Sequence, residues 1–341
     1  LSAGASAPAF LLPESTPARV HAPTPANLRR LAAALRQGKL VAMPTETVYG
    51  LAAHALDAEA CRAIFQAKRR PANDPLIVHV LDLGHAEELA EFNPAARRLA
   101  RHFWPGPLTL VLPKKPCVPS IVTSGGPTVA IRVPAHPLAR RLLRLAKIPL
   151  AAPSANLFGY ISPTTAAHVH EGLGARIPHI LDGGACAVGV ESTVLDMTNP
   201  RQPRVLRPGA VTVAELENFL GVKVHCAKAR GARSRQLAPG MLERHYSPRT
   251  PLVLRRPTSQ TPPAGTAIVW LRKPPGQKSM NDIFWLSRRG ALAEIARNLY
   301  AVLRQADTGG YRQIWVEPLP DGAGGLAAAI NDRLRRAAAK R

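Results

Sequence analysis

Cysteine, acidic residues and aromatic residues are all scarce in this chain of 341 residues. The four cysteines (Cys61, Cys117, Cys186 and Cys226) have no C-x-x-C spacing, which argues against a zinc site and against a disulfide framework. No apolar stretch approaches the ~18–20 residues that a membrane helix needs. These absences favour a soluble, cytoplasmic protein that makes no use of a membrane.

The shortage of acidic residues leaves a strongly positive chain, with 22 Asp and Glu against 45 Lys and Arg and a net charge of +23. Residues 222–341 contain 22 basic and 7 acidic residues, a surplus of +15, whereas residues 1–221 contain 23 and 15, a surplus of +8. A basic domain is typical of proteins that bind nucleic-acid phosphates. A solvated surface explains the charge equally well, because no aromatic-interleaved binding motif accompanies it.

The length predicts about two domains of ~150 residues each. Residues 1–26 are rich in Ala and Pro and predict a loose N-terminal extension. Residues 27–221 alternate apolar runs with helical patterns, which favours a large mixed α/β sheet. Residues 222–250 are polar, basic and turn-rich and predict a linker, whose length is typical of functional or disordered loops. Residues 251–341 resume the alternation and predict a compact second α/β domain.

The apolar runs and helical patterns give approximate positions for the elements. Strands are expected at 40–43, 75–81, 107–112, 128–133, 148–152, 179–181, 192–197 and 204–206, and in the second domain at 251–255, 266–271, 283–286 and 314–319. Helices are expected near 27–37, 58–68, 94–103, 136–146, 164–172, 212–220, 291–306 and 324–340.

Standard nucleotide-binding and hydrolase signatures are missing, since the chain has no Walker A loop, no G-x-G-x-x-G after a strand and no G-x-S-x-G. Polar clusters flank several predicted strands instead, namely PTET (44–47), PSAN (153–156), GVEST (189–193) and RPG (207–209). In α/β sheets ligands bind beyond strand ends, where such groups are presented. A turn or a helix cap accounts for any single cluster, but several in one sheet favour a binding site.

Charged residues inside or beside the apolar patterns leave two interpretations open. Arg132 interrupts an apolar strand, so it either pairs with Glu46 or Glu191 or binds a substrate carboxylate. The basic run 68–70 ends a helical pattern, where it either complements the helix dipole or binds phosphate. His79 lies in the middle of a predicted strand, where a structural histidine bonded to the backbone is the simpler interpretation.

Taken together, these motifs resemble those of the Sua5/YrdC family of L-threonylcarbamoyladenylate synthases, which act in the tRNA t6A pathway. The resemblance covers about residues 27–221, and the linker motif APGMLERHYSP (238–248) with the second domain resembles the two-domain Sua5 type. The motifs that carry it are KLVAMPTETVYGLAA (39–53), KRRPANDPLIVHV (68–80), WPGPLTLVL (104–112), VAIRVPAHP (129–137), APSAN (152–156), SPT (162–164), GVESTVLD (189–196) and LRPG (206–209).

The resemblance implies an α/β fold, with a large twisted mixed sheet of the YrdC type followed by a small Rossmann-like domain. It implies condensation of L-threonine, bicarbonate or CO₂, and ATP to threonylcarbamoyl-AMP and pyrophosphate, for modification of tRNA at t6A37. Mg²⁺ would be bridged by the ATP phosphates, with no protein metal site and no tightly bound cofactor. The product would pass to the t6A-transfer machinery, and the basic second half would be available for weak tRNA binding.

The resemblance also implies roles for thirteen residues. Arg132 would bind the threonine carboxylate, and Tyr246 in the linker would fold over the pocket as part of a lid. Phe158 and Tyr160 stand where smaller or basic residues are commoner in the family, next to the implied contact of Ser162. The implied catalytic residues are Lys68, Arg70, Ser154 and Asn156; those around threonine are Thr45, His79, Arg132, Ala152 and Ser192; and those around ATP are Lys68, Arg70, Thr128, Ser154, Asn156, Ser162, Arg207 and Tyr246.

Overall fold

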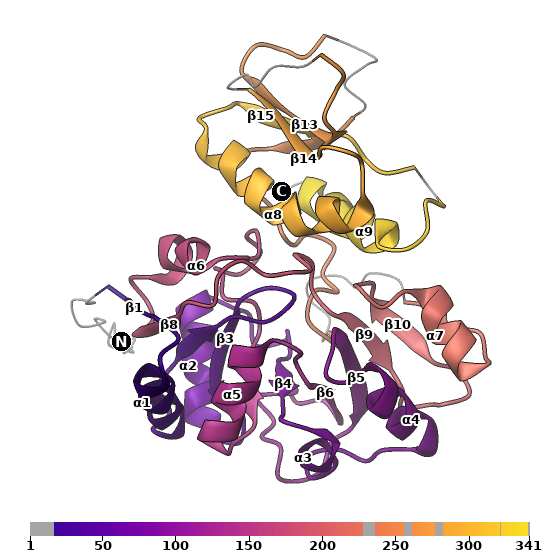
Figure 1. Ribbon diagram of the computed structural model, residues 1–341. Helices are drawn as coiled ribbons and strands as arrows, with labels where there is room; N and C mark the ends of the chain where they lie inside the picture. The colour runs from indigo at the N-terminus through magenta and orange to yellow at the C-terminus, as the bar shows by residue number, and fades with distance from the viewer. Residues whose placement is uncertain (1–16, 228–235, 256–260, 277–281, 321, 340–341) are drawn as a thin grey trace, which may run out of the picture.

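The computed structural model describes residues 17–227, 236–255, 261–276, 282–320 and 322–339. Figure 1 shows a large α/β unit and a smaller one stacked on it. No described helix combines the length and the apolar character that crossing a membrane requires.

The large unit is built on a twisted mixed sheet of eleven strands. Five of the neighbouring pairs, for example the two outermost, are parallel, and the other five are antiparallel. The predicted mixed sheet is therefore confirmed. The strands are β1 (Arg19–His21), β2 (Val41–Met43), β3 (Gly50–His54), β4 (Ile77–His79), β5 (Leu108–Pro113), β6 (Thr128–Arg132), β7 (Leu150–Ala151), β8 (His179–Leu181), β9 (Thr193–Asp196), β10 (Arg204–Arg207) and β11 (His225–Cys226), in the spatial order β1-β8-β2-β3-β7-β4-β6-β5-β9-β10-β11.

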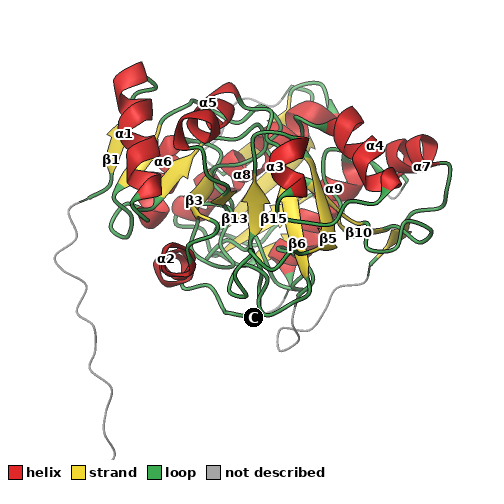
Figure 2. Cartoon of the chain, turned by 90° about the horizontal axis from the view of Figure 1, so that it is seen from below, coloured by secondary structure: helices red, strands yellow, loops and turns green. Residues whose placement is uncertain are grey.

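Helices cover both faces of this sheet. Leu28 and Leu142, from the first and fifth helices, share one apolar cluster with β2, while Ile64 of the second helix packs in another cluster with Leu51 of β3. Figure 2 accordingly shows the second and fifth helices on opposite sides of β3. The helices of the large unit are α1 (Pro25–Arg36), α2 (Ala58–Lys68), α3 (Leu83–Glu87), α4 (Pro94–Phe103), α5 (Pro137–Ala146), α6 (Ala166–Leu173) and α7 (Val213–Leu220).

Capping residues fix where several of these helices begin. The side chain of Asp57 accepts hydrogen bonds from the backbone of α2, and Thr24 and Asn93 do the same for α1 and α4. At α7, Thr212 and Glu215 form the reciprocal capping box that the sequence predicts. Helix α2 ends at Lys68, and the next residue, Arg69, adopts a left-handed backbone conformation that changes the direction of the chain before Arg70.

The small unit is a parallel sheet with two helices packed on one face. Its strands are β12 (Leu252–Leu254), β13 (Thr266–Arg272), β14 (Ile283–Ser287) and β15 (Gln313–Val316), in the order β12-β15-β13-β14. Its helices α8 (Leu292–Thr308) and α9 (Ala327–Ala338) lie between this sheet and the large unit (Figure 1). The elements expected at 251–255, 266–271, 283–286, 291–306, 314–319 and 324–340 are present.

Two predictions of unstructured chain need correction within the described residues. In the predicted loose extension, Arg19–His21 form β1 and pair in parallel with β8, because the edge of the sheet offers them unpaired backbone groups. In the predicted linker, His225–Cys226 form β11 beside β10, and Ala238, Met241 and Tyr246 are buried. Residues 1–16 and 228–235 lie outside the described residues.

Candidate active site

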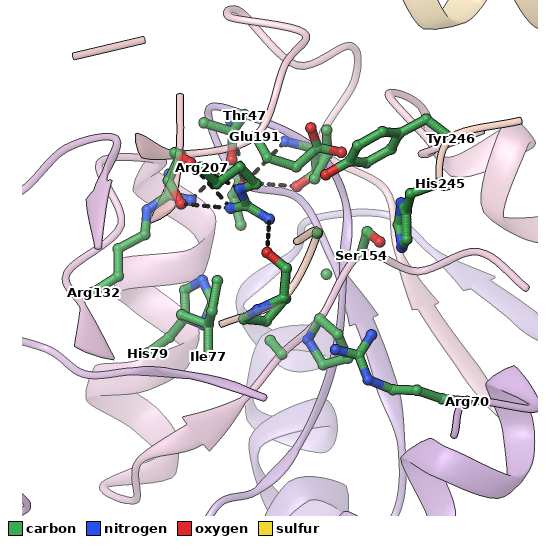
Figure 3. A pocket seen from close by; sticks show the side chains of 18 residues that line it. Thr47, Arg70, Ile77, His79, Arg132, Ser154, Glu191, Arg207, His245 and Tyr246 are labelled. Carbon is green, nitrogen blue, oxygen red and sulfur yellow. Dashed lines mark hydrogen bonds between the residues drawn. The ribbon is translucent and has the colours of Figure 1, made fainter. Parts of the chain in front are cut away.

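A small cavity of about 40 Å³ lies where loops at the strand ends of the large unit meet the linker. Figure 3 shows side chains from the β2–β3 loop, β4, β6, the segment before β9 and the end of β10 directed toward it. Nine of the thirteen implied site residues line this cavity. They are Thr45, Arg70, His79, Arg132, Ala152, Ser154, Ser192, Arg207 and Tyr246, and the other lining residues are Thr47, Val48, Gly50, Ile77, Pro153, Glu191, Pro239, Gly240 and His245.

Arg132, the last residue of β6, lines the cavity and is also held by an ion pair. Its Nη2 lies 2.6 Å from Oε1 of Glu46, its Nη1 donates to Thr47 Oγ1 at 3.0 Å, and its Nε donates to the carbonyl of Gly106 at 3.1 Å. Burial alone would raise the pKa of Glu46, but the charge of Arg132, together with hydrogen bonds from Arg132 and the backbone, keeps it below its usual value. The two interpretations of Arg132 therefore do not exclude each other, because a paired arginine faces the cavity.

Thr45 and His79 supply neutral polar groups beside Arg132. The Thr45 hydroxyl donates to the carbonyl of Val48 at 2.6 Å and accepts the backbone N–H groups of Thr47 and Val48, so its loop is rigid. Burial, and then the charge of Arg132, lower the pKa of His79 to about 3, so its imidazole is neutral near pH 7. Its Nδ1 makes no hydrogen bond within the described residues. This part of the cavity can therefore bind an anionic group together with hydrogen-bonding groups.

Arg70 is a second buried cation at the cavity. Its guanidinium forms an ion pair with Asp74 at 2.9 Å and donates to the carbonyls of Asp74 and Pro75 at 2.9 and 2.6 Å. Lys68, two residues earlier, does not line the cavity. Its ammonium group donates to the carbonyls of Ser154 and Asn156, the latter at 2.5 Å, and burial lowers its pKa well below the usual range.

Arg207, at the end of β10, joins the sheet to the linker. Its Nη2 donates to Oγ and to the carbonyl of Ser192, both at 3.1 Å, and its Nη1 donates to the carbonyl of Pro239 at 3.3 Å. Ser192 also shares a hydrogen bond of 2.8 Å with Thr109. The cavity is thus bordered by three guanidinium groups, a donor set that suits carboxylate and phosphate oxygens.

Four implied site residues lie outside the cavity lining. Besides Lys68, these are Thr128, Ser162 and Asn156. Thr128 begins β6 opposite Pro113. Ser162 is buried and donates to Glu191 at 2.5 Å, and the amide of Asn156 donates to the carbonyls of Leu157 and Tyr160 at 2.7 and 2.9 Å.

The linker covers the cavity with the implied Tyr246 and with Pro239, Gly240 and His245, which were not among the implied site residues. Tyr246 is buried with a positive φ of 61°, and Gly240 has a φ of 79°. A Cβ atom at Gly240 would lie 2.5 Å from Tyr246 Oη and 2.9 Å from Arg207 Cδ, so only glycine fits there. His245 packs edge-on against Phe158, at 5.7 Å between ring centroids, which gives the unusual Phe158 a role in holding the linker. Gly240 and His245 belong to the motif APGMLERHYSP (238–248), and the only signal of their role in the sequence was the length of the linker that contains this motif.

Carboxylates suited to a metal ion are not gathered at the cavity. Within the described ranges, no group of three or more His, Cys, Asp or Glu side chains could hold a metal ion. Among the lining residues, the carboxylate of Glu191 is paired with Arg333, and the carboxylate of Glu46, outside the lining, is paired with Arg132. The lining therefore fits the oxygens of an anionic ligand better than a cation bound by the protein alone.

Comparison with known proteins agrees with this geometry. A family model described as "Telomere recombination", for Sua5, YciO and YrdC proteins, matches residues 33–209, and one described as "Threonylcarbamoyl-AMP synthase, C-terminal domain" matches residues 211–339. The threonylcarbamoyl-AMP synthase of Pyrococcus abyssi is 42% identical over 327 residues, which cover 92% of this chain and 95% of that protein. The chain belongs to the Sua5 family of threonylcarbamoyl-AMP synthases.

Other members of the Sua5 family extend the comparison. The synthase of Bacillus subtilis is 40% identical over 328 residues, which cover 92% of this chain and 94% of that protein. The crystal structure of P. abyssi Sua5 complexed with L-threonine superposes with a TM-score of 0.83 at 41% identity, covering 92% of this chain and 94% of that chain. The predicted family and its two-part α/β fold are therefore confirmed.

Proposed function

We propose that this chain condenses L-threonine, bicarbonate or CO₂, and ATP to threonylcarbamoyl-AMP and pyrophosphate, the step that supplies the threonylcarbamoyl group for t6A37 of tRNA. The observation that carries the proposal is the gathering of three buried guanidinium groups, those of Arg70, Arg132 and Arg207, around one cavity. An amino-acid carboxylate and a nucleotide phosphate both need such cations. The 41% identical relative complexed with L-threonine supports the same assignment.

The threonine end of the site is proposed to consist of Thr45, His79, Arg132, Ala152 and Ser192. Arg132 would bind the carboxylate, since Glu46 and Thr47 already fix the orientation of its guanidinium. His79, neutral because of its low pKa, would accept or donate a hydrogen bond without repelling the threonine ammonium group.

The nucleotide end is proposed to include Arg70, Ser154, Arg207 and Tyr246, with Lys68, Thr128, Asn156 and Ser162 nearby. Arg70 and Arg207 would neutralise phosphate charge directly. Lys68 and Asn156 are bonded to neighbouring carbonyl groups, so contact with a phosphate requires them to exchange those bonds for the ligand. Until then they act by fixing the loop that carries Ser154.

The chemistry needs positioning and charge stabilisation more than a nucleophilic side chain. The threonine amine adds to CO₂ with loss of a proton, or to bicarbonate with loss of water, and the resulting carbamate oxygen attacks the α-phosphorus of ATP, with pyrophosphate as the leaving group. Arg70 and Arg207 would stabilise the charge that develops on the phosphate oxygens. Mg²⁺ held by the ATP phosphates would supply further charge neutralisation. The closed linker would keep water away from the labile carbamate and the mixed anhydride.

The linker is proposed to act as a lid. The cavity of about 40 Å³ is far below the ~300–1,000 Å³ that small-molecule sites occupy, so ATP cannot enter while Tyr246 and His245 remain in place. The linker must therefore move away to admit the substrates, and it would return over them before reaction.

Pyrophosphate release tests this proposal directly. Release should require ATP, threonine and bicarbonate together, and reactions that omit one of the three are the controls. Equal release without threonine would exclude the synthase. A non-catalytic RNA-binding protein, suggested by the charge of +23, would instead bind tRNA in a salt-sensitive manner that ignores ATP and threonine. The product would then pass to the t6A-transfer machinery.

A further inference from the structure

Glu191 is a buried carboxylate whose partners come mainly from the small domain. It directly precedes Ser192 and is 4% exposed. Its oxygens accept hydrogen bonds from Tyr300 Oη at 2.9 and 3.2 Å and from Arg333 Nε at 2.9 Å, in addition to that from Ser162. Although burial alone raises it, the charges of Arg333 and then Arg207 lower the pKa of Glu191 to about 2. The charge of this buried carboxylate at the cavity thus depends on Arg333 of α9 as well as on Arg207 and Ser162.

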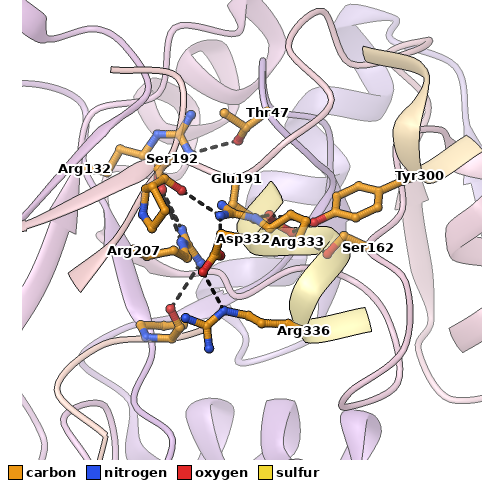
Figure 4. Close-up of polar contacts among 12 residues, drawn as sticks. Thr47, Arg132, Ser162, Glu191, Ser192, Arg207, Tyr300, Asp332, Arg333 and Arg336 are labelled. Carbon is orange, nitrogen blue, oxygen red and sulfur yellow. Dashed lines mark hydrogen bonds and ion pairs between the residues drawn. The ribbon is translucent and has the colours of Figure 1, made fainter. Parts of the chain in front are cut away.

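Arg333 of α9 contacts two residues that line the cavity, Glu191 and Tyr246, and the turn that follows Arg207. It is 1% exposed, and besides Glu191 it binds the carbonyl of Pro208 through Nη1 at 2.6 Å. Its guanidinium also lies over the ring of Tyr246, 5.3 Å from the centroid. Figure 4 shows this guanidinium beside Glu191, with Arg207 and Ser192 next to it. One side chain therefore joins the segment before Ser192, the turn after Arg207 and the linker.

Close packing of α8 supports the same interface. Gly189, two residues before Glu191, has a φ of 82°, and a Cβ atom there would overlap the backbone of Ala296 and Arg297 in α8. Tyr300 stacks on Tyr246 with 5.8 Å between ring centroids. The loop that carries Glu191 is thus shaped to receive the helix.

Arg336, one turn after Arg333, holds the linker from the other side. Its Nη1 donates to the carbonyl of Leu242, and its own carbonyl accepts hydrogen bonds from the N–H of His245 and the hydroxyl of Ser247, both at 3.4 Å. The linker residues on both sides of Tyr246 are therefore attached to α9 as well as to the large domain.

We infer that Arg333 is a positioning residue of the substrate site: by holding Glu191, Pro208 and Tyr246 together, it makes docking of the small domain a condition for a complete cavity and a closed lid. The inference rests on the proposed function for its kinetic readout alone. The ion pair between Arg333 and Glu191 is enough to join the two domains. The additional contact of Arg333 with the Tyr246 ring links this ion pair to the residue that covers the cavity.

The test compares Arg333→Met and Arg333→Lys with Arg335→Met, a matched control at an exposed position of the same helix. Methionine keeps an apolar chain of similar reach but loses the charge and the donors. Arg333→Met should raise the KM values for ATP and threonine at least about tenfold, with a smaller effect on kcat, because a buried charged contact is lost. Lysine keeps the charge without the guanidinium geometry, so the KM values of Arg333→Lys should lie between those of the wild type and of Arg333→Met. Arg335→Met should match the wild type.

Limited trypsin digestion without substrates gives a second readout that is independent of activity. Cleavage at Arg244, which is exposed in the linker, should be at least about tenfold faster in Arg333→Met, because the linker is then released more often. Thermal unfolding shows whether Arg333→Met is folded. If it is not, the KM values and the cleavage rate of Arg333→Lys test the inference instead. Wild-type KM values together with wild-type cleavage in the folded variant, or the same changes in Arg335→Met, would overturn the inference. If the wild type releases no pyrophosphate, the proposed function fails, whereas the cleavage comparison still tests Arg333.

Discussion

Each buried cation at the cavity is held in one orientation by acceptors that the fold supplies. Arg132 is bonded to Glu46, Thr47 and the carbonyl of Gly106, and Arg207 to Ser192 and the carbonyl of Pro239. A guanidinium that is already oriented loses little conformational freedom when a ligand binds. The site is preorganised at the level of single side chains.

Replacement of Arg132 tests whether that preorganisation serves threonine. Arg132→Ala should raise the KM for threonine by the equivalent of about 2–5 kcal/mol, because Glu46 is left without its partner and the substrate carboxylate loses its cation. Arg101→Ala, at an exposed position of α4, is the control. Steady-state kinetics with varied threonine measures the effect. An unchanged KM would mean that Arg132 only stabilises the sheet.

Acid stability tests the neutral histidines at the site. His79 and His245 have pKa values of about 3, lowered first by burial, against an ordinary 6.5 in the unfolded chain. Above pH 6.5 both states are neutral. As pH falls from 6.5 toward 3 the unfolded state takes up protons first, so the free energy of unfolding falls by about 1.4 kcal/mol per pH unit for each histidine. Urea unfolding between pH 6.5 and 5 should show a smaller slope in His245→Asn than in the wild type. Equal slopes would contradict a neutral, buried His245.

Among the elements, the linker segment 236–250 differs most from its sequence pattern. Its polar, basic composition predicts a loose connection, yet it packs Ala238, Met241 and Tyr246 against both domains. Its conformation depends on Gly240 and on the positive φ of Tyr246, which a pattern of polar residues does not reveal. The cover of the site is therefore specified by contacts rather than by local periodicity.

Substitution of Tyr246 tests the linker as a lid. Tyr246→Ala should lower turnover about tenfold or more, since the water-excluding ring and its contacts with Tyr300 and Arg333 are lost. Tyr246→Phe is the matched variant and should stay near the wild type, because Tyr246 Oη makes no hydrogen bond within the described residues. Pyrophosphate release at saturating substrates is the measurement. Full turnover in Tyr246→Ala would argue against a lid.

The sequence predicts the long, strongly patterned elements well and the short ones poorly. The expected helices at 58–68 and 94–103 coincide with α2 and α4, since their caps and apolar faces are local signals. Strands β1, β3 and β11 are not predicted, because short segments such as Gly50–His54 lack β-branched residues and become strands only through pairing with neighbours. Nine of the residues that line the cavity were implied by the family resemblance and not by a local pattern. The contact of Arg333 could not be predicted, because an ordinary amphipathic helix gives no sign of where it docks.

The two domains of the whole molecule carry different shares of the charge. The boundaries predicted at 221 and 251 stay a proposal, although the family models also meet near the first of them, at 209–211. The cavity uses only a few of the 45 basic residues, whereas the surplus of +15 lies beyond residue 221. Most of the surplus positive charge therefore lies in a different part of the chain from the basic residues that line the cavity.

Binding of tRNA tests what the remaining charge does. We expect weak, salt-sensitive binding to the full chain, and a reduced salt slope, by about 1.5–2, when the exposed Arg288 and Arg289 of the small domain are both replaced by Ala. Pyrophosphate release should not change in this variant, since neither residue is near the cavity. Filter binding at several salt concentrations measures the slope. An identical slope would show that this part of the basic surface is only solvated.

Because α9 comes after every other described element along the chain, the cavity is completed last during synthesis. Domains fold as they leave the ribosome, at about 5–20 residues per second, so the large sheet forms while Glu191 still lacks both of its distant donors. Until Tyr300 and Arg333 are made, the linker can pack only against the large domain. A nascent chain of this architecture therefore carries an incomplete cavity wall until its last described helix has been synthesised.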